Sequence, residues 1–130
     1  MKENILSNFK DSQYLAYEAM EYIKDMRSGK SSVLDDTDPS TKYFLQHNLS
    51  PAIKLGKGVV LFSPKMPAKE LIVRLLSIQT SIPLKELCVA DVTDKQWRDL
   101  GEAIDKLHCA KIFVNEEAKI NIKINTTWKR

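Results

Sequence analysis

Apolar residues recur every three or four positions between Ser12 and Met26, in SQYLAYEAMEYIKDM. This spacing places them on one face of a helix, so the segment predicts a long amphipathic helix. Ser12 is the expected N-cap, and Gly29 is the expected stop just past the last turn. The apolar stripe consists of Leu15, Ala19, Ile23 and Met26.

A second helix is predicted where Asp38 precedes Pro39, because aspartate favours the N-cap and proline the first helical position. The polar stretch SGKSSVLDDTDPS before it is typical of a loop or linker. Pro51 lacks an N–H and clashes one turn back, so we expect the helix to kink there or to restart with Ser50 as a new cap. Glycines at 56 and 58 then turn the chain toward a strand.

Two short apolar runs, VVLF from Val59 and IFV within residues 111–114, predict buried strands. Helical patterns over residues 67–79, 84–87 and 93–107 lie between the strands, and Thr93 with Gln96 matches a capping box. Trp97 is expected in the core of its helix. The order strand, helices, strand predicts an α/β fold with a short, mostly parallel sheet. The tail AKINIKIN alternates isoleucine with polar residues and predicts an edge strand.

The composition fits one soluble domain, with 130 residues, 43% hydrophobic and 28% charged. The net charge of +3 is too small to argue for a nucleic-acid-binding protein by itself. The last twelve residues contain Lys119, Lys123, Lys129 and Arg130 but no acid, so any weak nucleic-acid contact is expected at the C-terminus. No run reaches the ~18 apolar residues that span a bilayer and no secretory signal is visible. We therefore expect a cytoplasmic protein, without membrane contact, whose two cysteines are reduced.

Few residues suggest catalysis or metal binding. Gly29-Lys30-Ser31 matches the end of a phosphate-binding loop, but Lys24 stands where that loop needs its earlier glycine. Three aspartates follow and would repel a triphosphate, so a linker is the preferred interpretation. His47 and His108 have no motif around them, and Cys109 beside His108 has no second ligand pair at metal spacing. No metal and no cofactor are predicted.

Four motifs follow one another within residues 56–116, namely FSPKM, LIVRLL, VTDKQW and IFVNE. Their order and spacing resemble the ATPase domain of replicative DNA helicases of the DnaB family. That family carries a strand ending Phe-Ser-Leu-Glu-Met and a helix with Leu-Val-x-Arg-Leu-Leu, whose arginine matches Arg74. The resemblance implies a RecA-like, three-layer α/β domain, here incomplete.

The same resemblance identifies where the chain departs from the family. Lys65 stands at the position of the glutamate that activates the attacking water, and this substitution should remove a general base. Pro39, Ser40 and Thr41 fall where the family has Gly-Lys-Thr. The sequence also stops before the family's next core strand and its DNA-binding loops. We therefore expect that the chain is not an enzyme and that Lys65 is a solvent-facing residue.

The first helix resembles the linker helix that, in these helicases, docks on the motor domain of the neighbouring subunit. This implies a docking helix in residues 1–30, a polar linker in 31–41 and a degenerate RecA-like half domain in 42–130. If that helix finds no groove on its own domain, a homodimer by helix exchange is expected. The implied interface residues are Leu15, Ala19, Tyr22, Ile23 and Met26.

These observations favour a non-catalytic, helicase-like protein that binds a DnaB-type helicase, or itself, by subunit mimicry and so regulates or inhibits DNA replication. Three alternatives remain open. The chain could be a truncated replicative helicase with no separate activity. It could be an active, nucleotide-dependent helicase component, or it could bind DNA directly through its basic tail.

Overall fold

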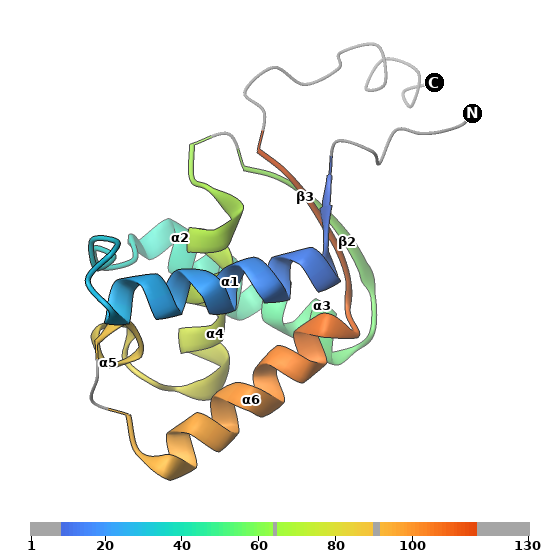
Figure 1. Ribbon diagram of the computed structural model, residues 1–130. Coiled ribbons are helices and arrows are strands. Elements are labelled where there is room, and N and C mark those ends of the chain that lie inside the picture. Colours follow the sequence, from blue (N-terminus) through green and yellow to red (C-terminus); the bar gives the residue numbers. More distant parts are fainter. Residues whose placement is uncertain (1–8, 64, 90–91, 117–130) are drawn as a thin grey trace, which may run out of the picture.

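The computed structural model describes residues 9–63, 65–89 and 92–116, a small α/β domain (Figure 1). Its sheet has the order β1-β3-β2, formed by β1 (Lys10–Asp11), β3 (Lys111–Asn115) and β2 (Gly58–Phe62). β2 and β3 are parallel, which confirms the parallel pair predicted from the two apolar runs. β1 is antiparallel to β3 and was not predicted, because two residues carry no alternation. The predicted strand AKINIKIN lies outside the described residues.

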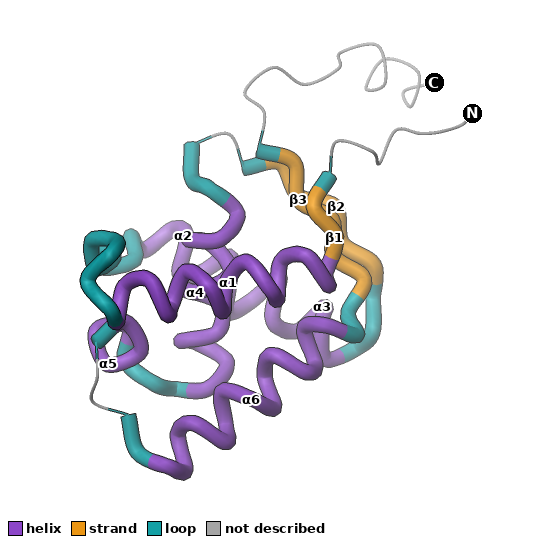
Figure 2. The backbone as a smooth tube through the Cα atoms, in the orientation of Figure 1, coloured by secondary structure: helices purple, strands orange, loops and turns teal. Residues whose placement is uncertain are grey.

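The helices cover one face of the sheet (Figure 2). Ile112 and Val114 of β3 are fully buried on this face, beside their β2 partners Val59 and Leu61. On the opposite face Val60 is 48% exposed and Phe62 44% exposed. The second helical layer of the predicted three-layer domain is not seen among the described residues.

Helix α1 (Ser12–Arg27) confirms the first predicted helix, but its cap is Asp11 and not Ser12. The Asp11 carboxylate accepts a hydrogen bond from the Tyr14 N–H, while Ser12 is the first helical residue. The Ser12 hydroxyl instead bonds to β3, accepting from the Ile112 N–H at 2.8 Å and donating to the Ile112 carbonyl at 3.2 Å. At the other end Gly29 has a φ of 84° and ends the helix as predicted, because only glycine adopts this conformation at little cost.

The second predicted helix runs from α2 (Pro39–Phe44) through the π-helical turn η2 (Leu45–Leu49) into α3 (Ser50–Lys54). Asp38 caps α2 and Pro39 is its first residue, as predicted. A new helical element, α3, does begin at Ser50, but Ser50 is not its cap, because it has helical backbone angles and the N-cap position is Leu49. The wider π turn accommodates Pro51, which has no N–H to donate, without breaking the helix.

The three later helices match the predicted positions: α4 (Ala68–Thr80), α5 (Leu84–Cys88) and α6 (Asp94–His108). The Thr93 and Gln96 capping box is present in both directions, with bonds of 3.1 and 2.9 Å. Trp97 was predicted to lie in the core and is instead 39% exposed. It stacks beneath the Arg27 guanidinium, 4.6 Å from the ring centroid, at the end of α1.

One hydrophobic core joins α1 to the rest of the described chain. Helix α1 packs against α4 and α6 and more lightly against α5. The helix in the predicted docking segment 1–30 therefore shares its core with residues 42–130, and α2 begins inside the range 31–41. Among the described residues no helix is long and apolar enough to cross a membrane.

The two cysteines should differ sharply in reactivity. Cys88 is fully buried, and burial raises the pKa of its thiol, whereas Cys109 is exposed at the end of α6. We expect alkylation of Cys88 to be about a hundredfold slower than that of Cys109, since a thiol reached only through local opening reacts in proportion to the open population. Mass spectrometry of peptides after timed alkylation measures both rates. Equal rates would contradict the packing of α5 against α1.

Candidate functional site

The carboxyl end of β2 faces the amino end of α2 across a small cavity. This cavity, of about 570 Å³, brings the segment after β2 together with the first turn of α2. In the sequence, each segment was identified separately by a departure from the family pattern, at Lys65 and at Pro39-Ser40-Thr41. The residues lining it are Asp38, Ser40, Thr41, Phe44, Leu61, Phe62, Ser63, Lys65, Met66 and Leu71.

The Asp38 carboxylate takes up the hydrogen-bond donors at the start of α2. Its Oδ2 accepts from the Ser40 hydroxyl at 2.6 Å and from the Thr41 N–H at 3.0 Å. Its Oδ1 accepts from the Thr41 hydroxyl at 2.7 Å. The bond from Ser40 is the largest of the causes that hold the pKa of Asp38 well below its usual range, followed by the two bonds from Thr41. This end of the helix therefore already carries a fixed negative charge.

Arg74 of α4 holds the loop that leads to Asp38. The side chain is buried, and its Nη1 donates to the Asp35 carbonyl at 2.8 Å and to the Thr37 hydroxyl at 3.0 Å. Its Nε makes no hydrogen bond within the described part of the chain. Arg74 had been recognised only by its place in a motif, and the two residues that it contacts lie 37 and 39 positions away in the sequence.

Lys65 is exposed at the edge of the cavity, as predicted for a solvent-facing residue. The turn that carries it is closed by the Ser63 hydroxyl, which donates to the Met66 carbonyl at 2.7 Å. A lysine at this place supplies a positive charge and three donors but no carboxylate to accept a proton from water. Neither histidine lines this cavity; His47 packs on Tyr43 with ring centroids 4.3 Å apart.

The five predicted interface residues lie in the core of their own chain. Tyr22 is 9% exposed and Met26 4%, while the other three are fully buried. In this conformation none of them is available to a neighbouring subunit, so they meet another chain only if α1 leaves its own groove. Their role in an interface stays a prediction. The fully buried three are Leu15, Ala19 and Ile23.

A small charged cluster ties β1, β3 and α4 together at the same end of the sheet. Lys10 pairs with Glu116 at 2.9 Å and with Glu18 at 3.0 Å, and Glu116 also accepts the Ala68 N–H at the start of α4. Partial burial raises the pKa of Glu116, but the hydrogen bonds from Lys10 and Ala68 outweigh it and leave the pKa lowered. Within the part of the chain that the structure describes, no three His, Cys, Asp or Glu side chains are placed to hold a metal ion.

Acid should weaken the fold through Glu116. The pKa of Glu116 is lower in the folded protein than in the unfolded one, so ionised Glu116 stabilises the fold above about pH 4.5. This stabilisation is lost as the pH falls through the folded pKa. When the pH is lowered from about 5 to about 3, the free energy of unfolding should fall by about 1 kcal/mol less in Glu116→Gln than in the unaltered chain. Urea titrations at several pH values measure this. Glu21→Gln, on the surface of α1, is the control, and identical acid slopes for the unaltered chain and Glu116→Gln would contradict the prediction.

A family model and two known proteins that match this chain agree with one another. A family model described as the DnaB-like helicase C terminal domain matches residues 28–130. A replicative DNA helicase DnaB of Helicobacter pylori strain J99 is 29% identical over 102 residues, covering 78% of this chain. The same protein from strain 26695 is 33% identical over 72 residues, covering 55% of this chain. These regions amount to 21% and 15% of the two helicases, so the chain spans about a fifth of their length or less.

Proposed function

Since the chain belongs to the family of DnaB-like helicase C-terminal domains, we propose that it is a non-catalytic member that binds a DnaB-type helicase, or a second copy of itself, by subunit mimicry. In this proposal the domain is an incomplete RecA-like domain. It occupies a subunit's place beside a true helicase subunit, and it regulates or inhibits replication because it cannot hydrolyse ATP.

The observation that carries the non-catalytic part is the Asp38 carboxylate bound to Ser40 and Thr41. A phosphate needs free N–H and hydroxyl donors at such a helix start. Here those donors are engaged, and the carboxylate adds a negative charge that repels an anion. Lys65 at the other side of the cavity offers no base for the attacking water.

The binding part is supported by α1 and the groove that it fills. Helix α1 buries a continuous apolar face against α4 and α6, and residues 28–38 connect it to α2 without a further helix or strand. If two such domains exchange this helix, each groove is refilled by an equivalent helix, so most contacts are kept and the cost is small. The same groove on a related helicase subunit would accept the same face.

Two other proposals differ in what they expect. A truncated helicase without a role of its own would fold but bind no helicase subunit. An active helicase component would bind ATP with Mg²⁺ at the cavity between β2 and α2. Calorimetry with ATP and Mg²⁺ on the unaltered chain and on Thr41→Val separates the second of these from our proposal, which expects no binding that depends on Thr41.

The test of mimicry uses the full chain and the full-length replicative helicase of the same cell. We expect the two to co-elute in size-exclusion chromatography and the helicase to unwind more slowly in the mixture. Tyr17→Ser changes a residue that is 63% exposed on the far face of α1 and should leave binding intact. For self-association, two preparations labelled separately at the exposed Cys109 should show energy transfer after mixing. Absence of co-elution together with unchanged unwinding would reject the helicase partner.

A further inference from the structure

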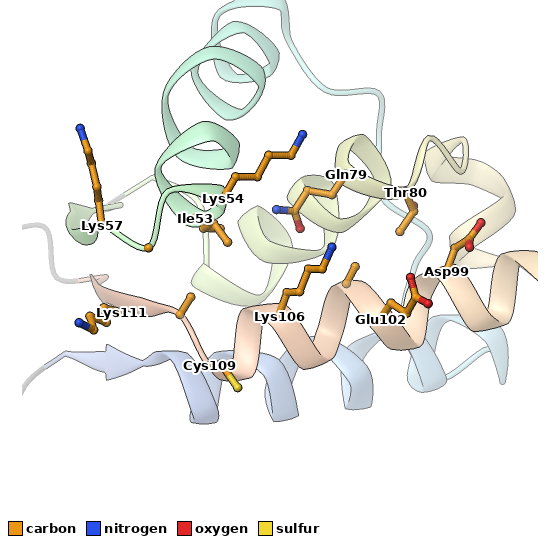
Figure 3. Close-up of a pocket in the computed structure, with 13 residues that line it drawn as sticks. Ile53, Lys54, Lys57, Gln79, Thr80, Asp99, Glu102, Lys106, Cys109 and Lys111 are labelled. Atoms are coloured by element: carbon orange, nitrogen blue, oxygen red, sulfur yellow. The ribbon is translucent and has the colours of Figure 1, made fainter.

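A second cavity lies at the opposite end of the two parallel strands from Asp38 and Lys65. It has a volume of about 750 Å³ and is bordered by the ends of α3 and α4, by α6, by the turn before β2 and by the first residue of β3 (Figure 3). Cavities of this size hold small molecules of a few hundred daltons. It shares no lining residue with the cavity at α2.

One part of this cavity is rich in hydrogen-bond donors. In Figure 3 the Gln79 amide lies between the ammonium ends of Lys54 and Lys106, and these three side chains come from α4, α3 and α6. Lys57 and Lys111 also line the cavity. None of the four lysines forms an ion pair with a residue that the structure describes.

The positive charge here exceeds what the helix ends need. The carboxyl ends of α3, α4 and α6 meet at this cavity, and each carries about half a negative charge, which Lys54 offsets at α3 and Lys106 at α6. The carboxylates of Asp99 and Glu102 balance most of the remaining charge of the cavity as a whole, but they lie in its other part, so positive charge gathers around Lys54 and Lys106. An anionic group placed between Lys54 and Lys106 would gain charge-assisted hydrogen bonds from both.

The other part of the cavity offers acceptors. Asp99 and Glu102 project from α6 on the side away from Lys57 and Lys111 (Figure 3), and one oxygen of Asp99 also pairs with Lys95 at 3.2 Å. Carboxylates repel phosphate but accept hydrogen bonds from hydroxyl groups. The cavity is also lined by small or apolar side chains that suit the carbon face of a sugar. They are Ile53, Ala103 and Ala110.

We propose that this cavity binds a phosphorylated polyol, such as a sugar phosphate or the sugar-phosphate part of a nucleotide. Lys54, Lys106 and the Gln79 amide hold the phosphate, and Asp99 and Glu102 accept hydrogen bonds from the sugar hydroxyls. The cavity is separate from the cavity at α2, so this proposal does not depend on the proposed function.

The test uses the full chain without divalent cations and three probes: ribose 5-phosphate, ADP and pyrophosphate. We expect ribose 5-phosphate and ADP to bind saturably in calorimetry and to raise the melting temperature. The double variant Lys54→Gln with Lys106→Gln should weaken both by about tenfold or more. The matched control Lys30→Gln with Lys42→Gln removes the same charge from remote exposed positions and should change binding by less than about twofold.

Glu102→Gln separates the two parts of the cavity. It should weaken the binding of ribose 5-phosphate and ADP. The binding of pyrophosphate should not weaken, because pyrophosphate has no hydroxyl-bearing sugar and gains from the lost negative charge. Binding of ADP alone would assign the nucleotide, and binding of both sugar probes would assign the sugar phosphate. The proposal is overturned if neither sugar probe binds saturably or if the two double variants weaken binding equally. It is also overturned if Lys65→Gln abolishes binding, because that places the ligand at the other cavity.

Discussion

Replacing Ile23 by aspartate should leave the protein largely unfolded at room temperature. Ile23 is fully buried on the face of α1 that packs against α4 and α6. Truncating such a side chain costs about 2–5 kcal/mol, and burying an unpaired carboxylate costs several more. The total stability of a domain of this size is about 5–15 kcal/mol, so the single change removes most of it.

Circular dichroism and urea unfolding measure this effect, and Lys24→Asp is the matched control. Lys24 is the next residue of α1 and is exposed, so the same acid there should cost about 1 kcal/mol or less. A folded, cooperative Ile23→Asp protein would show that α1 lies outside the core. The prediction also limits the use of this variant in binding experiments, because loss of binding would follow from loss of the fold.

Ser12→Ala should lower the unfolding free energy by about 2 kcal/mol, a large effect for the loss of one hydroxyl group. Strand β1 ends at Asp11, and the Ser12 hydroxyl continues its pairing with β3 by bonding to both the N–H and the carbonyl of Ile112. Alanine would leave both backbone groups buried with fewer partners, and an unsatisfied buried group costs more than the bond itself contributes.

The same substitution at the other end of the helix is the control. The Ser28 hydroxyl donates to the Asp25 carbonyl at an exposed site, where water replaces a lost bond, so Ser28→Ala should cost about 0.5 kcal/mol or less. Urea unfolding of the three proteins measures both differences. Equal effects of Ser12→Ala and Ser28→Ala would contradict the role of Ser12 as an extension of β1.

Local patterns predicted most helices and the parallel strands, because their signals lie within a few residues. The Thr93 and Gln96 pair specified its capping box, and Gly29 specified its stop, without help from the rest of the chain. Pro51 predicted an interruption of the helix near Ser50, but the sequence does not tell that the helix widens into a π turn there and does not break. Trp97 was misplaced because periodicity gives the face of a helix but not how far its packing extends.

The candidate site could be predicted only in separate parts. Asp38 was recognised as a cap and Lys65 as a substituted glutamate, but their meeting at one cavity depends on how α2 and β2 pack. The apolar face of α1 was likewise found from its spacing. Spacing does not tell whether that face is covered by the same chain or by another, and in the structure it is covered by α4 and α6.

The most direct test of whether the protein is non-catalytic is phosphate release from ATP and Mg²⁺ by the full chain. We predict no hydrolysis above the rate without protein, and none in Lys65→Glu, because restoring a carboxylate there leaves the donors of Ser40 and Thr41 bound to Asp38. A family member with its base in place gains about 10²–10⁴ in rate from that group alone. Turnover by the unaltered chain that disappears in Thr41→Val would contradict a non-catalytic protein.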